Sequence, residues 1–294
     1  MGRIVWLASY PKSGNTWMRA FLFNVIGGTD KPADINRMTG TFSRSDSAIG
    51  WFRILRRTPP QSWTAREIAA MRPRVQEMIA NGQSATIFCK THSALIRHHG
   101  APTVNRAVSA GAIYILRNPL DVVLSFADFM DVTVDAAIGF MATPGFMTGM
   151  GEGHVPVPLD TWSRNVESWT AGHGQGHGQS HARGLHTVRY EDMLADPRRT
   201  FRAVTRFLDL DVTAERLDTA IGNASFRQLR KQERQHGFNE RSQHQDAFFR
   251  KGTAGHWRDH LTEAQIARIC NDHRAQMKRF DYLPDGFQDI PRSD

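Results

Sequence analysis

An anion-binding loop is the chemistry that the residues near the N-terminus favour most. Residues 10–17 read YPKSGNTW, after an apolar stretch and before a run with helical periodicity. A strand–loop–helix junction points free backbone N–H groups and the positive end of a helix at one place. Lys12 adds a mobile positive charge, and Gly14 permits close approach of the backbone. The further donors expected in this loop are the side chains of Ser13, Asn15 and Thr16.

This loop is not a Walker A motif. In that motif Gly-Lys-Ser/Thr comes at the end, whereas here Lys12 precedes Gly14. The loop therefore predicts an anion site that is built differently from the phosphate loop of a P-loop NTPase. A turn that does no more than cap the helix is the alternative.

Two further segments carry cations where a phosphate can be held. Arg117 follows an apolar stretch, and a proline two residues later is well placed to begin a helix that carries Ser125 toward the same ligand. Taken alone, Arg117 fits a structural ion pair as well as an anion ligand. Near the C-terminus, Arg250 and Lys251 precede Gly252, which predicts either a loop that wraps a phosphate or a plain basic loop. Together the three segments indicate more than one phosphate position.

These segments resemble the cytosolic-type sulfotransferases, which use 3′-phosphoadenosine 5′-phosphosulfate (PAPS) and release adenosine 3′,5′-bisphosphate (PAP). The family pattern YPKSGTTW matches residues 10–17, with Asn15 in place of its first Thr. The resemblance covers residues 3 to 280 in the family's order and spacing. The other segments that carry it are Arg117-Asn118-Pro119 through Ser125, Tyr190-Glu191-Asp192-Met193, Ser225-Phe226, and Arg250-Lys251-Gly252 through Trp257.

The resemblance implies a donor site assembled from these matched residues. The loop at residues 12–17 would hold the 5′-phosphosulfate, with Lys12 beside the oxygen that bridges sulfur and phosphorus. Charge-assisted contacts of arginine suit the 3′-phosphate. The residues implied for that phosphate and its surroundings are Arg117, Ser125, Phe249, Arg250, Lys251 and Gly252. Trp17 and Phe226 would flank the adenine and Tyr190 would contact its edge, although core packing is the alternative for both flanking residues.

The catalytic candidate is His92, in a Lys-Thr-His segment that the resemblance also matches. It follows an apolar stretch, at the end of a strand where open α/β sheets bind ligands. A neutral His92 would take the proton of an acceptor hydroxyl as general base. Lys12 and Lys90 would stabilise charge on the transferring and leaving groups. No metal is expected, because a sulfuryl group carries less charge than a phosphoryl group.

The elements that must position these residues follow from alternating patterns. Short apolar, β-branched stretches predict strands, and the segments between them have helical periodicity. The predicted strands are residues 3–8, 86–90, 112–116 and 186–190, and the predicted helices are residues 16–26, 64–80, 120–130, 160–170, 197–208 and 262–280. Strands that alternate with helices indicate an α/β fold, a mostly parallel sheet flanked by helices. We expect one domain over residues 1–294.

Three segments break this pattern and are expected to be lids or acceptor loops. They are residues 31–63, 131–159 and 230–249. Long irregular segments in a compact domain are often binding loops. Their aromatic side chains and methionines favour a small apolar or aromatic hydroxyl compound as acceptor; the aromatic residues in question are Trp51, Phe52, Phe140 and Phe146.

Composition narrows the function classes. The chain has 294 residues, with 37 Lys and Arg against 29 Asp and Glu, for a net charge of +8. This is an ordinary globular composition, which excludes disordered, collagen-like and disulfide-stapled proteins. Cys89 and Cys270 fit a reducing compartment, and the N-terminal apolar run is too short for a signal peptide or membrane span. We therefore expect a cytoplasmic protein that does not bind a membrane. Because the matched cations converge on three loops instead of spreading along one face, we also expect a small-molecule partner and no nucleic acid.

Several alternatives remain open from the sequence. A nucleotide kinase is one, and a non-catalytic nucleic-acid-binding protein, suggested by the charge of +8, is another. Residues 172–184 are rich in Gly and His and predict a solvated loop or, alternatively, a metal site. The family's dimer motif is poorly matched around Thr262, so the sequence leaves monomer and homodimer open.

Overall fold

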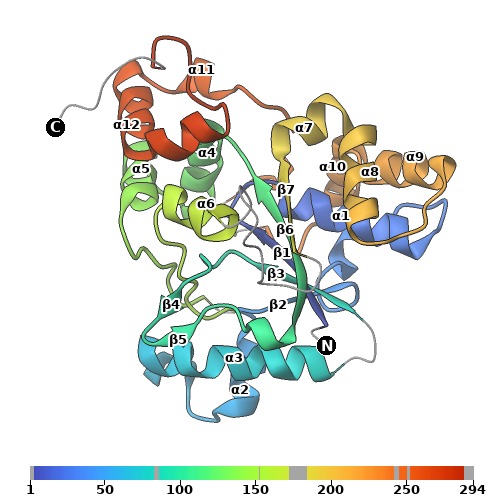
Figure 1. Cartoon of the computed structure of the whole chain (residues 1–294), viewed down its shortest axis with the longest axis vertical. Helices are drawn as coiled ribbons and strands as arrows, with labels where there is room; N and C mark the ends of the chain where they lie inside the picture. The colour runs from blue at the N-terminus through green and yellow to red at the C-terminus, as the bar shows by residue number, and fades with distance from the viewer. Residues whose placement is uncertain are drawn as a thin grey trace.

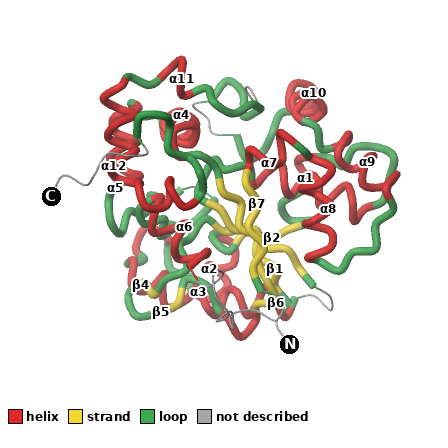
Figure 2. Tube along the Cα trace, turned by 45° about the horizontal axis from the view of Figure 1, so that its top comes forward, coloured by secondary structure: helices red, strands yellow, loops and turns green. Residues whose placement is uncertain are grey.

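A five-stranded parallel sheet lies at the centre of the protein, with strand order β2-β3-β1-β6-β7 (Figures 1 and 2). The computed structural model describes residues 3–82, 86–151, 153–171, 184–241, 245–249 and 252–287. The strands are β1 (Ile4–Ser9), β2 (Ser43–Ser45), β3 (Ile87–Thr91), β6 (Ser109–Leu116) and β7 (Leu185–Arg189). A separate antiparallel pair joins β4 (Arg97–His98) to β5 (Ala101–Pro102). All four predicted strands are confirmed, and β2 is an edge strand too short for its pattern to be read.

The strand order puts the predicted donor loop at the middle of the sheet. From β1 the chain builds β2 and β3 on one side of β1, then β6 and β7 on its other side. The carboxyl ends of β3, β1 and β6 therefore meet where the direction of winding reverses, which is the place where open α/β sheets bind ligands.

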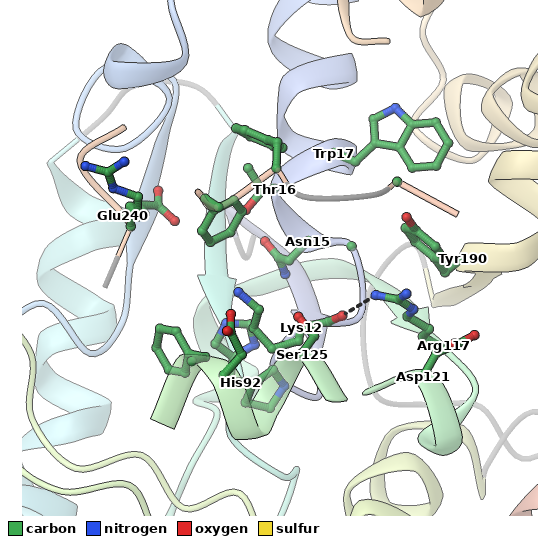
Figure 3. Close-up of a pocket in the computed structure, with 18 of the residues that line it drawn as sticks. Lys12, Asn15, Thr16, Trp17, His92, Arg117, Asp121, Ser125, Tyr190 and Glu240 are labelled. Carbon is green, nitrogen blue, oxygen red and sulfur yellow. Dashed lines mark hydrogen bonds between the residues drawn. The ribbon is translucent and has the colours of Figure 1, made fainter. Parts of the chain in front are cut away.

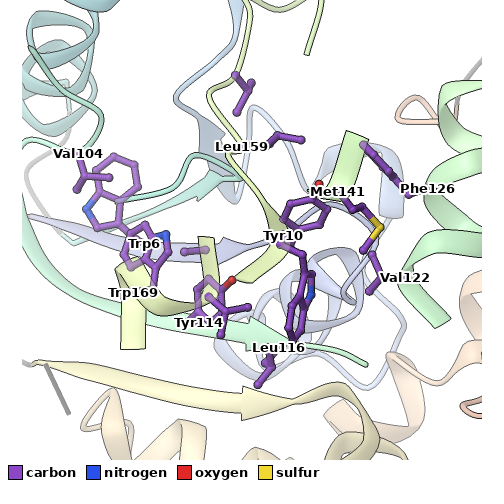
Figure 4. Packing of buried hydrophobic residues seen from close by; sticks show 14 of the residues in the cluster. Trp6, Tyr10, Val104, Tyr114, Leu116, Val122, Phe126, Met141, Leu159 and Trp169 are labelled. Atoms are coloured by element: carbon purple, nitrogen blue, oxygen red, sulfur yellow. The ribbon is translucent and has the colours of Figure 1, made fainter. Parts of the chain in front are cut away.

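Both faces of the sheet are covered by helices. Every residue of β1 and β6 is buried. Along β1 the side chains of Trp6 and Ala8 enter one hydrophobic cluster, and those of Val5 and Leu7 enter the other, as the alternation of a strand requires. Figure 4 shows the first cluster, where Trp6 lies near Tyr114. The protein is thus a single α/β domain, which confirms the predicted fold class.

The helices form two groups, one on each face. The first face is covered by α2 (Ile49–Leu55), α3 (Ala65–Asn81), α4 (Pro119–Met130), α5 (Val134–Ala142), α6 (Trp162–Thr170), the short α11 (Trp257–His260) and α12 (Glu263–Arg279). The second is covered by α1 (Asn15–Gly27), α7 (Tyr190–Ala195), α8 (Pro197–Phe207), α9 (Ala214–Asn223) and α10 (Phe226–His236). Figure 1 shows α1, α8, α9 and α10 gathered on one side of the sheet. Short 3₁₀ turns lie at Ile35–Arg37, Pro60–Ser62 and Arg106–Val108.

Local sequence signals explain where the predicted helices begin. Thr64 and Glu67 form a capping box at α3, and Thr262 begins α12 in the same way. Asn118 caps α4, whose first residue is a proline. All six predicted helices are present with ends within two residues of the prediction.

The three segments predicted to be irregular contain more regular structure than expected. Residues 31–63 hold β2 and α2, residues 131–159 hold α5, and α10 extends into residues 230–249. The two helices α2 and α5 have 7 and 9 residues, too few for their periodicity to stand out. In α10 only Leu229 is a fully buried apolar residue, so an amphipathic pattern is hard to see. Among the described residues, no helix is both long and apolar enough to cross a membrane.

Candidate active site

One cavity of about 1470 Å³ opens at the carboxyl ends of the central strands. Most of the predicted site residues line it, although they come from distant parts of the chain. Those that line it are Lys12, Gly14, Asn15, Thr16, Trp17, Lys90, His92, Arg117, Ser125, Tyr190, Phe226, Phe249 and Gly252. Ser13 is buried behind the loop. Arg250 and Lys251 lie outside the described residues, as does most of the Gly/His-rich segment 172–184.

The loop between β1 and α1 has the strained backbone of a ligand-binding turn. Lys12 adopts a φ of 65°, in the left-handed region that a lysine rarely occupies, and Gly14 has a φ of 101°. A Cβ atom at Gly14 would lie 2.6 Å from the ring of Tyr190, so the glycine is required for this contact. The loop leads directly into a helix of 13 residues with no acid in its first turn. Its positive end therefore faces the cavity without a competing carboxylate.

The side chain of Asn15 is predicted to donate a hydrogen bond to an anion, but its amide hydrogens are engaged elsewhere. Its amide donates to the Leu7 carbonyl at 2.8 Å and to Ser9 Oγ at 3.3 Å. Both hydrogens of the amide are therefore used to fasten the loop to β1. The asparagine that departs from the family pattern is a brace for the loop, and only its backbone N–H remains to face an anion.

Arg117 lies at the end of β6 and crosses to the donor loop (Figure 3). Its Nη1 donates to the Lys12 carbonyl at 3.1 Å, and its guanidinium lies 4.2 Å from the centre of the Tyr190 ring. Its Nη2 also reaches the Thr253 carbonyl, at 3.3 Å. No carboxylate of the described chain lies within ion-pair distance of Arg117. The geometry therefore does not support the alternative that Arg117 forms a structural ion pair. The guanidinium keeps its positive charge for an anion in the cavity.

Asp121 positions the loop that contains Gly252, a role that the sequence reading missed. Its carboxylate accepts hydrogen bonds from the N–H groups of Gly255 at 2.7 Å and Trp257 at 3.2 Å. The loop is thereby fastened to the first turn of α4, beside Arg117. An acid in the first turn of a helix was the available signal, but such an acid usually serves the helix itself.

Aromatic rings form one end of the cavity. The Trp17 and Tyr190 rings meet edge to face with centroids 5.7 Å apart, and Phe226 meets Phe249 at 6.3 Å. Gly252 packs flat on Phe226, because a Cβ atom there would lie 2.3 Å from the ring. Trp17 and Phe226 are only partly buried and both line the cavity, so core packing is not their only role. Rings in this arrangement offer faces and edges to a flat heterocycle.

His92 is held in a single orientation at the floor of the cavity. Its Nδ1 lies 2.8 Å from the Ser9 carbonyl and 3.1 Å from Ser9 Oγ. A carbonyl only accepts, so Nδ1 carries the hydrogen and Nε2 keeps its lone pair in the neutral ring. Burial and, second to it, the nearby charge of Lys90 lower the pKa of His92 to about 3. The imidazole is therefore neutral near pH 7, with Nε2 able to accept a proton.

Two lysines flank His92 in different surroundings. The Lys12 ammonium lies 4.1 Å from the centre of the Phe248 ring and 5.0 Å from that of Phe129. Lys90 lies 3.2 Å from a carboxylate oxygen of Glu240. Figure 3 shows Glu240 across the cavity from Arg117 and Tyr190, with Lys12 and His92 between them. The sequence does not predict Glu240, Phe129 or Phe248 as site residues, because no local pattern connects them to Lys12 or Lys90.

The aromatic residues expected around the acceptor lie elsewhere, and that prediction is wrong. Phe52 is fully buried in the core, Trp51 packs against the same cluster, and Phe140 stacks on Phe146 with ring centres 4.8 Å apart. None of these four lines the described cavity, because all of them belong to or pack against the first hydrophobic cluster. The apolar lining on this side comes instead from Leu124, Phe129, Val132, Val134, Val157 and Leu159, with Ser45, Ser47 and His154 as polar neighbours.

No group of His, Cys, Asp or Glu with the arrangement of a metal site occurs among the residues that the structure describes. The cations and N–H groups of the cavity are thus the positive groups that the described chain itself presents to an anion.

Known proteins with similar sequences are sulfotransferases. Amine sulfotransferase of Oryctolagus cuniculus is 25% identical over 285 residues, which cover 94% of this chain and 81% of that protein. Sulfotransferase 1A1 of Canis lupus familiaris is 24% identical over 281 residues, covering 92% of this chain and 82% of its own length.

Solved structures share the fold. Mouse sulfotransferase SULT7A1 complexed with PAP superposes with a TM-score of 0.56 at 19% identity, covering 95% of this chain and 86% of the other. Retinol dehydratase in a complex with retinol and PAP gives a TM-score of 0.60 at 16% identity, with 95% and 82% covered. The family model described as a sulfotransferase domain matches residues 3–281. The chain therefore belongs to the sulfotransferase domain family.

Proposed function

We propose that this protein transfers the sulfuryl group of PAPS to a hydroxyl group of a small acceptor. The observation that carries the proposal is the meeting, in one cavity, of a strained loop at a helix N-terminus, an arginine with no carboxylate partner among the described residues, and a neutral histidine. Membership of the sulfotransferase domain family supports it, as do the PAP complexes of two proteins with the same fold.

The donor fits the charged half of the cavity. The N–H groups of the loop after β1 and the Lys12 ammonium would hold the 5′-phosphosulfate. Arg117 would bind the 3′-phosphate, with Ser125 and the loop at Gly252 beside it, and the adenine would lie between Trp17 and Phe226. The described contacts of Arg117 are to carbonyl oxygens and a ring face, which leaves its charge available for the phosphate.

The transfer needs one proton acceptor and one stabilised leaving group. Nε2 of His92 would take the proton of the acceptor hydroxyl as its oxygen forms the new bond to sulfur. The bond from sulfur to the bridging oxygen breaks, and PAP leaves with the electron pair of that bond. Lys12 and the loop N–H groups would stabilise the charge that grows on the leaving phosphate, and Lys90 would face the sulfuryl oxygens.

The acceptor is proposed to be a small, largely apolar hydroxyl compound. The apolar wall of the cavity combines aliphatic side chains such as Val132, Val134 and Val157 with Phe129, whose ring lies 5.0 Å from the Lys12 ammonium. Pockets of this kind bind apolar bodies and orient them through a few polar groups. Ser45 and His154 are the polar groups available for that purpose on this wall.

Sulfuryl transfer is tested with [³⁵S]PAPS, the purified protein and a panel of phenols, aliphatic alcohols and amines, in the presence of EDTA. We expect labelled product with at least one hydroxyl acceptor, and formation of that product at least about 100-fold slower in a matched reaction with His92→Ala. Transfer from [γ-³²P]ATP with no transfer from PAPS would replace the proposal with a nucleotide kinase. Amines are included because one relative is named an amine sulfotransferase.

A further inference from the structure

A half-buried carboxylate stands between two cations at the wall of the cavity. Glu240 follows α10, and each of its oxygens lies 2.7 Å from a guanidinium nitrogen of Arg19. The Thr39 hydroxyl donates to the same carboxylate at 2.7 Å. The second carboxylate oxygen accepts from Lys90 Nζ at 3.2 Å. Arg19 is fully buried, so this bidentate pair is the fixed part of the cluster.

The cluster connects the donor loop with the catalytic lysine. Arg19 lies on α1 and also donates to Thr16 Oγ1, at 3.2 Å, in the loop that faces the donor. The segment that carries Glu240 is itself fastened, because the Asn239 N–H donates to Asn36 Oδ1 at 2.9 Å. Two other segments of the chain, α1 and residues 36–39, thus fix the place of this carboxylate, and Lys90 is its partner at the end of β3.

We propose that Glu240 is a positioning residue for Lys90, which holds the ammonium group of that lysine at the cavity wall and in its charged form. The inference rests on the proposed function, in which Lys90 faces the transferring sulfuryl group. Glu240 itself need not touch either substrate, because its oxygens are already engaged by Arg19, Thr39 and Lys90.

The charges around Lys90 show why such a partner is needed. Burial lowers the pKa of Lys90, and the positive charge of Arg19 lowers it further, while Glu240 and Asp46 raise it. Two imidazoles, His92 and His154, also face Lys90, and its charge lowers the pKa of each. A buried ammonium that loses its carboxylate loses its proton more readily. Without Glu240, Lys90 would have burial and Arg19 acting against its charge and only Asp46 in its favour.

The pKa of Lys90 can be measured without any turnover. Trace labelling with acetic anhydride across pH 6–11, read by mass spectrometry, gives the apparent pKa of that amine in the free protein. In Glu240→Gln we expect it to fall by about one unit or more relative to the unsubstituted protein. Thr39→Val is the matched control, since it removes a hydrogen bond to Glu240 without a change of charge, and its Lys90 pKa should stay within about 0.3 unit of the original.

Turnover then gives a second readout. With PAPS as donor, the fall of kcat at high pH should begin at a lower pH in Glu240→Gln. This shift should be absent in the double variant Glu240→Gln and Lys90→Arg, because a guanidinium group stays charged. An unchanged Lys90 pKa in folded Glu240→Gln overturns the positioning role, whether or not the protein uses PAPS. If the pKa of Lys90 shifts but the protein transfers no sulfuryl group from PAPS, the positioning role of Glu240 is supported and the proposed function is overturned.

Discussion

The two halves of the cavity are built in opposite ways. The donor half is made of short contiguous segments at the ends of strands, with a strained loop, an arginine and aromatic rings that contact one another. The acceptor half is made of single aliphatic side chains from segments between residues 124 and 159, with polar neighbours at Ser45, Ser47 and His154. Under the proposed function the donor half would bind through fixed charges and N–H groups, while the acceptor half would offer shape and apolar surface. Such a division suits an enzyme with one constant donor and an acceptor that differs between relatives.

The largest effect is expected where the two halves meet. His92→Ala should lower kcat by about 10²- to 10⁴-fold, because it removes the proton acceptor. The affinity for PAP, measured by calorimetry, should stay within about threefold, since His92 contacts the backbone of Ser9 rather than the donor loop's cations. Loss of PAP binding together with turnover would show that His92 supports the structure of the donor half instead.

The next largest effect is expected for Phe52, which lies in the core outside the acceptor half. Phe52→Ala should lower the free energy of unfolding by about 3–5 kcal/mol, because the ring is fully buried. The KM for the acceptor should not change at a temperature where the variant is folded. Ile54→Ala on the same helix is the matched control, since Ile54 is 64% exposed and its loss should cost less than about 0.5 kcal/mol. A changed acceptor KM in folded Phe52→Ala would put Phe52 back in the pocket.

The donor half should respond to the loss of one charge. Arg117→Ala should weaken PAP binding by about 10- to 100-fold, as expected for a charge-assisted contact to a phosphate. Adenosine 5′-phosphosulfate lacks the 3′-phosphate, so its affinity should fall by much less. Equal losses for both nucleotides in a calorimetric titration would mean that Arg117 acts by holding the Lys12 loop rather than by binding the 3′-phosphate.

A smaller change is expected on the acceptor wall. Val134→Ala trims a half-buried side chain and should lower kcat/KM for the acceptor by about threefold to tenfold. The Kd of PAP should be unaffected, because Val134 is not among the residues proposed to hold the donor. If the variant changed donor affinity and left acceptor kinetics alone, the division of the cavity into two halves would be incorrect.

The smallest response should come from the titration of His92 itself. Its pKa of about 3 in the folded protein is below the 6.5 of an ordinary histidine, so its ring should not titrate by NMR between pH 8 and 5. Between pH 6.5 and 3 the unfolded chain binds a proton that the folded chain does not, so stability falls as the pH is lowered through this range. A His92 midpoint near 6.5, assigned with His92→Gln, would contradict the buried Nδ1–H form.

The sequence predicts the sheet and the donor half well because both depend on local patterns. The loop at residues 10–17 and the segment after Arg117 each carry their strand end, turn and helix start within a few residues. Asn15 was misjudged because its donors are consumed by Leu7 and Ser9, a matter of side-chain direction that spacing does not reveal.

The rest depends on contacts between distant segments. Arg19 meets Glu240 across 221 positions, and Lys90 meets it across 150, so neither pairing has a local signature. The prediction of the acceptor wall is wrong for a related reason. Aromatic residues indicate burial, but they do not indicate whether a side chain lies in the core or in a cavity. Phe52 and Phe140 are apolar enough for either place, and the helices α2 and α5 decide between them.

The central claim is that the donor half of the cavity recognises PAPS. Calorimetric titration of the metal-free protein with PAP and, in parallel, with ATP in the presence of Mg²⁺ tests this claim most directly. We predict that PAP binds at least about tenfold more tightly than ATP, the ratio expected when one charge-assisted contact is lost. Equal affinities, or ATP binding that depends on Mg²⁺ and exceeds that of PAP, would contradict it.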